Sequence, residues 1–118
     1  MKSFITGSRL ARKFGVGMSK ILKGQKLDSG KPMWSLLPWV EIDSVVRVLT
    51  FGAKKYGAEN WKRVKEGETR YFNAALRHLV AVQRGELIDK ETGEPHYAHA
   101  ICSLLFCFWF SRNANQPE

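Results

Sequence analysis

Several features are scarce in this sequence of 118 residues, and each scarcity excludes a class of protein. Cys102 and Cys107 are the two cysteines, five positions apart in a run that favours a helix, where they would point about 140° away from each other. This spacing fits neither a disulfide pair nor a zinc motif, so we expect reduced core thiols in a cytoplasmic protein. No apolar run reaches the roughly 20 residues that cross a bilayer, so no membrane contact is expected. No segment alternates as a β-strand does.

Acidic residues are almost missing from the first thirty positions, which hold seven lysines and arginines against the single acid Asp28. This part of the chain therefore carries most of the formal net charge of +8. It lacks the continuous apolar stretch of a secretory signal, although its composition is similar to that of an organelle transit peptide. We interpret residues 1–25 as a basic N-terminal arm that is solvated or docks on a partner, with nucleic acid among the polyanions that it could bind.

Apolar residues recur at the helical interval in three segments, which we predict as helices over about 40–56, 68–84 and 95–111. Gly57 and Gly85 follow the first two segments as stop signals, and Pro95 stands where a helix favours a proline in its first turn. The length allows one modest core. The predicted fold class is therefore all-α, a small helical bundle of three main helices, with the domain at residues 26–112 and a tail at 113–118.

The third segment contains an apolar run, YAHAICSLLFCFWF at residues 97–110, that lacks a polar face of ordinary width. Such a helix is either buried on all sides or completed by a second subunit. Because so small a chain cannot easily surround it alone, we expect a homo-oligomer, a dimer or larger. Trp109 and Phe110 should then lie in or beside the interface.

All three histidines of the chain surround the connection between the last two predicted helices. On the third helix His96, His99 and Ser103 share one face, and an antiparallel second helix would bring His78 toward them. The connection also carries four carboxylates, those of Glu86, Asp89, Glu91 and Glu94. These side chains fit a site for a cation or a phosphate, and they equally fit a buried hydrogen-bond network with only a structural role.

Six residues outside this connection have the chemistry of nucleotide contacts. They are Tyr56 and Trp61 for stacking on a base, Lys31, Lys55 and Arg77 for phosphate charge, and Asn60 for a base edge. The alternative is that Trp61 covers the core and that the lysines are solvated. The stretch GQKLDSGK at residues 24–31 is not a phosphate-binding P-loop, because its glycine spacing is wrong and proline follows Lys31.

Three stretches, KLDSGKPMWSLLPW, VLTFGAKKYGAENWKRV and RHLVAVQRGELIDKETGEPHYAHAICSLLF, resemble the family of dATP/dGTP diphosphohydrolase N-terminal domains, which is common in bacteriophages and prophages. The resemblance covers residues 26–110 and includes several ordered motifs, among them Gly-Lys-Pro, Arg-His, Gly-Glu-x-x-Asp and His-x-x-His. It implies an all-α protein related in style to the all-α NTP pyrophosphohydrolases. The implied activity is metal-assisted hydrolysis of a purine dNTP to a dNMP and pyrophosphate, in the host cytoplasm if the protein is phage-encoded.

The resemblance also implies roles for single residues. The implied catalytic residues are His78, Glu86 and Asp89; the implied nucleotide contacts are Lys31, Lys55, Tyr56, Asn60, Trp61 and Arg77; the implied ligands of Mg²⁺ or Mn²⁺ are Asp89, His96 and His99. The expected partner is a purine nucleotide or another phosphorylated small molecule. The alternative function is a non-catalytic protein that binds and sequesters a nucleotide, and a third is a basic module that binds nucleic acid.

Overall fold

The computed structural model describes residues 23–114, which form helices and loops without a β-strand. The chain divides into two compact units, one ending at Leu37 and the other beginning at Pro38. In the first unit the described residues, 23–37, contain one short 3-10 helix, η3 (Trp34–Leu36). Most of the predicted basic arm and the end of the predicted tail lie outside the described residues.

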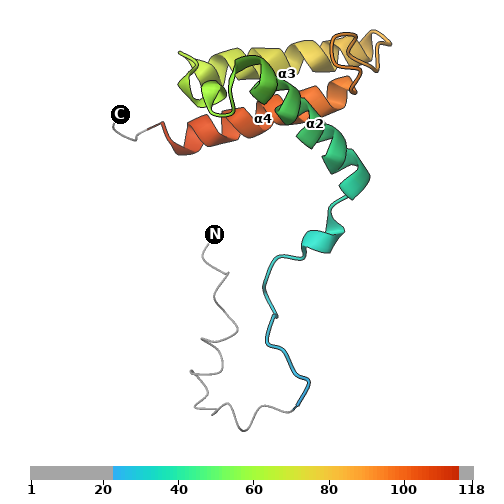
Figure 1. Cartoon of the computed structure of the whole chain (residues 1–118), viewed down its shortest axis with the longest axis vertical. Helices are drawn as coiled ribbons and strands as arrows, with labels where there is room; N and C mark the ends of the chain where they lie inside the picture. Colours follow the sequence, from blue (N-terminus) through green and yellow to red (C-terminus); the bar gives the residue numbers. More distant parts are fainter. Residues whose placement is uncertain (1–22, 115–118) are drawn as a thin grey trace. The chain divides into compact units, whose positions relative to one another are not determined.

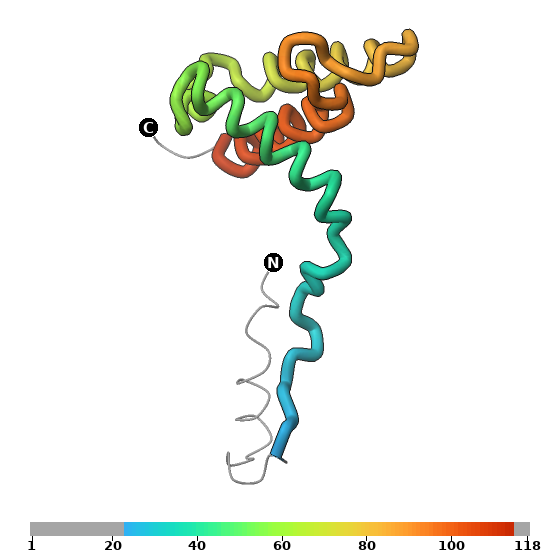
Figure 2. Tube along the Cα trace, turned by 45° about the vertical axis from the view of Figure 1, so that its right-hand side comes forward, coloured from blue at the N-terminus to red at the C-terminus, as the bar shows by residue number. Residues whose placement is uncertain are grey.

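The second unit is an all-α bundle, as predicted. Its main helices in the described range are α2 (Trp39–Tyr56), α3 (Gly67–Gln83) and α4 (His96–Arg112). Each lies within one residue of its predicted bounds at both ends. A 3-10 helix, η4 (Asn60–Arg63), lies between α2 and α3. Helices α3 and α4 run antiparallel along each other, and α2 crosses α4 (Figures 1 and 2).

Glycines end the first two helices, as the sequence predicts. Gly57 has a φ of 99° and Gly85 a φ of 92°, values that a residue without a Cβ atom adopts easily. The N–H of Gly57 donates a hydrogen bond to the carbonyl oxygen of Ala53 at 2.8 Å, which closes the last turn of α2. Pro95 differs from its predicted place, because its ψ of 142° is extended and makes it the residue before α4.

The core lies where α2 crosses α4 and consists of small side chains. Val45 of α2 packs with Ala98 and Cys102 of α4. The thiol of Cys102 donates to the carbonyl oxygen of Val45 at 3.3 Å, and burial raises its pKa to about 12. Both cysteines are free thiols, Cys102 buried and Cys107 half-buried. Cys102 is therefore an inert core residue that allows the two helices to approach closely.

A second contact region is aromatic and joins η4 to the C-terminal half of α4. The ring of Trp61 stacks on that of Phe106 with centroids 4.2 Å apart, and Trp109 meets Trp61 edge-on at 5.1 Å. The ring of Phe110 lies so close to Gly67, the first residue of α3, that a Cβ atom there would overlap it. Trp109 and Phe110 therefore make contacts within their own chain, Trp109 with η4 and Phe110 with the first residue of α3.

The close approach of the Phe110 ring to Gly67 leads to a prediction about stability. We expect Gly67→Ala to lower the free energy of unfolding by about 1–3 kcal/mol, because the added methyl group overpacks the site. The matched control is Gly52→Ala within α2, where an added Cβ atom meets nothing within 4 Å. The control should stabilise the helix by about 0.5–1 kcal/mol. Urea unfolding followed by circular dichroism measures both, and a Gly67→Ala protein as stable as the control would contradict the packing described.

Helix α4 is not buried on all sides within one chain. Its buried residues lie on the side that faces α2 and α3, and they are His96, Ala98, Ala100, Cys102 and Ser103. Five large apolar residues on the opposite side are exposed, and we call them the outer face of α4: Tyr97, Ile101, Leu104, Leu105 and Phe108. Phe108 is 62% exposed. Among the described residues no helix has both the length and the apolar character that a membrane span requires.

The outer face of α4 generates a prediction about assembly. We expect the protein to be a dimer or larger at micromolar concentration, because a contiguous apolar face of this kind is typical of a subunit interface. Leu105→Glu should give monomers with unchanged helix content. Val40→Glu, which changes a residue that is 75% exposed near the start of α2, is the control. Light scattering that finds a stable wild-type monomer would refute the prediction.

Candidate functional site

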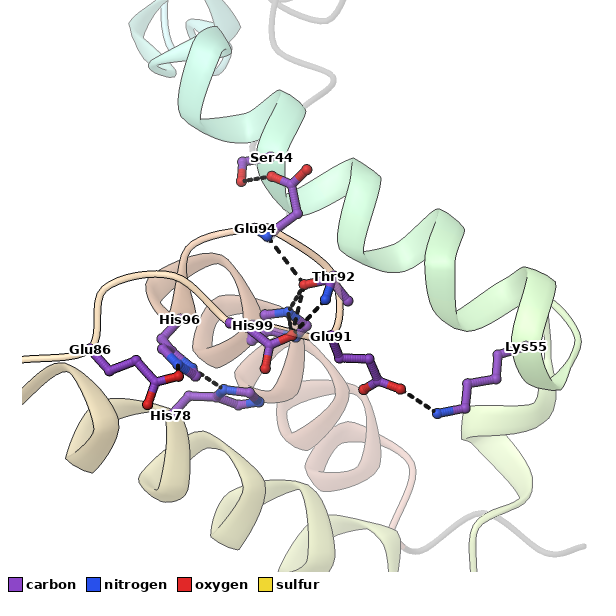
Figure 3. Close-up of polar contacts among 10 residues, drawn as sticks. Ser44, Lys55, His78, Glu86, Glu91, Thr92, Glu94, His96 and His99 are labelled. Atoms are coloured by element: carbon purple, nitrogen blue, oxygen red, sulfur yellow. Dashed lines mark hydrogen bonds and ion pairs between the residues drawn. The ribbon is translucent and has the colours of Figure 1, made fainter.

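The structure brings the three histidines together at the end of the α3 and α4 pair (Figure 3). The Nδ1 atoms of His78 and His96 lie 2.8 Å apart, at hydrogen-bond distance. The rings of His78 and His99 stack, with centroids 4.6 Å apart and an angle of 16° between their planes. His78 comes from α3, whereas His96 and His99 come from the first turn of α4. The antiparallel arrangement therefore produces the convergence that the sequence predicts.

Two carboxylates of the connecting loop reach these rings. Oε1 of Glu86 lies 3.4 Å from Nε2 of His96, and Oδ2 of Asp89 lies 3.4 Å from Nε2 of His99. Thr92, which the sequence does not single out, joins this group. Its N–H and its hydroxyl donate to Oδ2 of Asp89 at 3.0 and 2.9 Å, and its Oγ1 lies 2.7 Å from Nε2 of His99. The loop is thus tied to α4 through one threonine.

Burial and neighbouring polar groups shift the pKa values of His78, His99 and Asp89. Burial lowers the pKa of His78, and the neighbouring His99 and His96 lower it further. Burial also lowers the pKa of His99, although the charge of Asp89 opposes this. Burial raises the pKa of Asp89, but the two hydrogen bonds from Thr92 outweigh it and hold that pKa below its ordinary value. At neutral pH His78 and His99 are therefore neutral and Asp89 is ionised.

The implied metal ligands, Asp89, His96 and His99, do not form a metal-binding group. Between residues 23 and 114 no three or more His, Cys, Asp or Glu side chains are arranged to hold a metal ion. Several of their donor atoms are engaged, since Oδ2 of Asp89 accepts two hydrogen bonds from Thr92, Nε2 of His99 faces Thr92 and Nδ1 of His96 faces His78. Mg²⁺ also prefers oxygen ligands to imidazole nitrogen. A cation here would depend on ligands from outside this cluster.

The same loop is tied to α2 by ion pairs that the sequence does not predict (Figure 3). The carboxylate of Glu94 accepts hydrogen bonds from Oγ of Ser44 at 2.7 Å and from Nε of Arg47 at 2.8 Å. Nζ of Lys55 lies 2.9 Å from Oε2 of Glu91. The sequence does indicate charged loop residues, but it contains no signal for partners so distant along the chain. These contacts hold the loop against α2 at two points along that helix.

A cavity of about 500 Å³ lies between α2, η4, α3 and α4 and has a mostly apolar lining. Three of the predicted nucleotide contacts, Tyr56, Asn60 and Trp61, line it. His99 also lines it, so the cavity and the histidine cluster meet at this residue. One face of the Trp61 ring is covered by Phe106, whereas Tyr56 is 64% exposed. Tyr56 is therefore the more accessible aromatic ring at this cavity.

Two of the predicted phosphate contacts, Arg77 and Lys31, do not line this cavity. Arg77 lines a separate, open cavity of about 550 Å³ on α3, together with Asn73, Arg84 and Glu86. Lys31 belongs to the first unit, where it is exposed and its N–H donates to the carbonyl oxygen of Asp28 at 3.1 Å.

Fold and site together define a small all-α domain with a cavity that opens onto a histidine and carboxylate cluster. The family described as dATP/dGTP diphosphohydrolase, N-terminal, matches residues 22–118, and the chain belongs to this family. A protein of Salmonella phage PMBT28 named dATP/dGTP diphosphohydrolase is 38% identical over 92 residues, which are 78% of this chain. The chain spans about a third (31%) of the length of that relative. No solved structure matches the chain.

The ion pair of Glu94 generates a prediction about pH. Hydrogen bonds from Arg47 and then from Ser44 lower the pKa of Glu94 below its ordinary 4.5. The stabilisation by this pair is therefore complete above pH 4.5 and is lost as the pH falls through the folded-state pKa. The difference in unfolding free energy between wild type and Glu94→Gln should accordingly shrink from neutral pH to about pH 3.

Urea unfolding of both proteins at several pH values measures this difference. The control is Glu59→Gln, which removes an exposed pair with Lys62 at 2.8 Å and should change the stability little at neutral pH. A difference for Glu94→Gln that is the same at every pH would mean that the carboxylate does not hold the loop through its charge.

Proposed function

We propose that this domain binds a purine deoxynucleoside triphosphate in the cavity between α2 and α4 and hydrolyses it to a dNMP and pyrophosphate. The observation that carries the proposal is that a mostly apolar cavity of about 500 Å³ meets a cluster of three histidines and two carboxylates at His99. The volume is in the range of small-molecule sites, which combine an apolar lining with a few convergent polar groups. The name of the phage relative supports the nucleotide as ligand.

The apolar part of the cavity suits the purine base. Tyr56 can stack on the base with its exposed ring, and Asn60 beside it offers a donor and an acceptor for a base edge. Tyr71 and Ser103 add two hydroxyl groups to the lining. Aromatic stacking depends little on the identity of the base, so selection of a purine falls to the polar side chains.

The polar end of the cavity suits the phosphates. Lys55 pairs with Glu91 near this end, and both side chains are exposed, so a phosphate can replace the carboxylate as the partner of the ammonium group. Mg²⁺ or Mn²⁺ enters the proposal as a cation carried by the triphosphate, because Mg²⁺ is usually held by substrate phosphates together with one or two carboxylates. Such a cation neutralises phosphate charge.

The second candidate is a domain that binds the nucleotide without hydrolysing it. Two observations favour this alternative: the matching family is described as the N-terminal part of a dATP/dGTP diphosphohydrolase, and no metal-binding group of three or more side chains lies within the described residues. In that case the cavity would serve sequestration or substrate delivery. Both candidates place the nucleotide in the same cavity and differ only in whether the bond between the α- and β-phosphates breaks.

The test is to incubate the pure protein with each dNTP and Mg²⁺ or Mn²⁺, then separate the products by ion-exchange chromatography. We expect dAMP or dGMP with pyrophosphate from the purine nucleotides and much less product from dCTP and dTTP. Chelation of the cation with EDTA should stop the reaction. Intact dATP or dGTP bound by the protein would support the non-catalytic alternative, and no binding of any dNTP would contradict both.

The nucleotide affinity of the Tyr56→Ala variant tests whether the purine base stacks on Tyr56. Loss of base stacking costs about 1–3 kcal/mol, so the Kd for dATP should rise about 5- to 150-fold. Trp39→Ala is the matched control, because Trp39 is an aromatic residue of the same helix that is 52% exposed and does not line the cavity. Equal Kd values for Tyr56→Ala and wild type would place the base elsewhere.

A further inference from the structure

The hydrogen bonds of Thr92 determine which nitrogen of His99 carries the proton. The hydroxyl has one proton to donate, and it lies 2.9 Å from Oδ2 of Asp89 and 2.7 Å from Nε2 of His99. Because Asp89 is ionised, the proton must point to the carboxylate; otherwise two oxygen lone pairs would face each other at that distance. Oγ1 of Thr92 then accepts from Nε2–H of His99 and from the N–H of Glu94 at 3.2 Å. Neutral His99 is therefore protonated at Nε2, and its Nδ1 has a free lone pair.

The same proton count applies to the other two histidines. One proton lies between the Nδ1 atoms of His78 and His96, which are 2.8 Å apart. Nε2 of His96 lies 3.4 Å from Oε1 of Glu86, a contact that favours a proton on that nitrogen. Nδ1 of His96 then accepts from Nδ1–H of His78. This leaves His78 with a free lone pair at Nε2, so the cluster contains two basic nitrogens.

The cavity distinguishes between these two nitrogens. His99 lines it, and His78 does not. Within residues 23–114, Nδ1 of His99 makes no hydrogen bond, and the one fully buried side-chain nitrogen or oxygen without a partner there is Nε2 of His96. Nδ1 of His99 is therefore not sealed in the interior. Because His99 lines the cavity, its Nδ1 is the nitrogen that we assign to a water molecule of the cavity, whereas His78 stacks on His99 and does not line the cavity.

We infer that His99 is the general base of the proposed hydrolysis, with Nδ1 as the atom that accepts the proton of the attacking water. The inference rests on the proposed function. The water oxygen forms a bond to the α-phosphorus, and the bond from that phosphorus to the bridging oxygen breaks. The electron pair of the broken bond leaves with pyrophosphate. One water proton moves to Nδ1 of His99, which afterwards releases it to solvent.

Asp89 and Thr92 act as positioning residues in this arrangement. They fix the tautomer and the ring orientation of His99, and the carboxylate stabilises the imidazolium that forms when Nδ1 takes a proton. The other groups around His99 are His78 on α3, His96 on α4, and Glu91 and Glu94 on the loop. The hydrogen bond of Thr92 at Nε2 of His99 leaves the lone pair of Nδ1 available to accept a proton.

The first test reads the tautomer directly and needs no nucleotide. In the full-length protein at neutral pH, the NMR chemical shifts of the imidazole nitrogens should identify His99 as the Nε2–H form. Thr92→Val removes the hydroxyl at similar shape and should mix the two tautomers, whereas Thr92→Ser should keep the wild-type signal. A wild-type His99 that is protonated at Nδ1 would overturn the inference, whether or not the protein hydrolyses nucleotides.

The second test is turnover of dATP or dGTP by His99 variants. His99→Gln keeps a donor that can reach Thr92 but has no basic nitrogen, so we expect kcat to fall about 10²–10⁴-fold with KM changed only a few-fold. His99→Ala should lose activity similarly and regain part of it in added imidazole. Imidazole should not restore His99→Gln, whose side chain fills the space.

The outcomes separate this inference from the proposed function. If wild type hydrolyses dATP or dGTP and His99→Gln retains kcat within a few-fold, the base is another group and the proposed function stands. If the wild-type protein hydrolyses no dNTP, both the proposed hydrolase function and the assignment of His99 as general base are wrong. Circular dichroism of each variant checks that the fold is intact. If His99→Ala does not fold, the turnover of His99→Gln alone decides between these outcomes.

Discussion

The structure depends on one constraint: α4 is apolar on most of its surface, and its few polar side chains must find partners on one side. A buried polar group without a hydrogen bond costs about 1–3 kcal/mol, so the contacts of His96 with His78 and of His99 with Thr92 direct α4 toward α3 and the connecting loop. Small residues on the same side, Ala98 and Cys102, let α2 approach closely. The position of the loop and the cavity beside it follow from this orientation.

Charged and polar side chains hold the connecting loop against both α2 and α4. Glu94 binds α2 through Ser44 and Arg47, and Asp89 binds α4 through Thr92 and His99. This arrangement keeps a carboxylate beside an imidazole at the edge of an apolar cavity. Such surroundings shift pKa values, and shifted values are common at sites that bind or transform ligands. The same contacts that orient the loop therefore also fix the surroundings of His99.

Much of the fold could be predicted from the sequence because the signals are local. The helical spacing of apolar residues and the glycines at 57 and 85 located the helices within one residue. The convergence of His78, His96 and His99 also followed, since it needs only helical geometry and an antiparallel turn. The cavity, the role of Thr92 and the pairs Glu94–Arg47 and Lys55–Glu91 could not be predicted. The cavity and the two ion pairs join residues far apart in the chain, and a single sequence does not encode such partners in any local pattern. Thr92 lies close in sequence to Asp89 and His99, but a lone threonine in a loop gives no signal of its own.

The central claim is that the nucleotide binds in the cavity between α2 and α4, with its phosphates next to His99. The most direct measurement is NMR of the protein with a non-hydrolysable dATP analogue. The claim predicts contacts between the adenine protons and the Tyr56 ring, together with shifted signals of His99 and Ser103. Changes confined to Arg77 and Arg84, which line the separate cavity on α3, would contradict it.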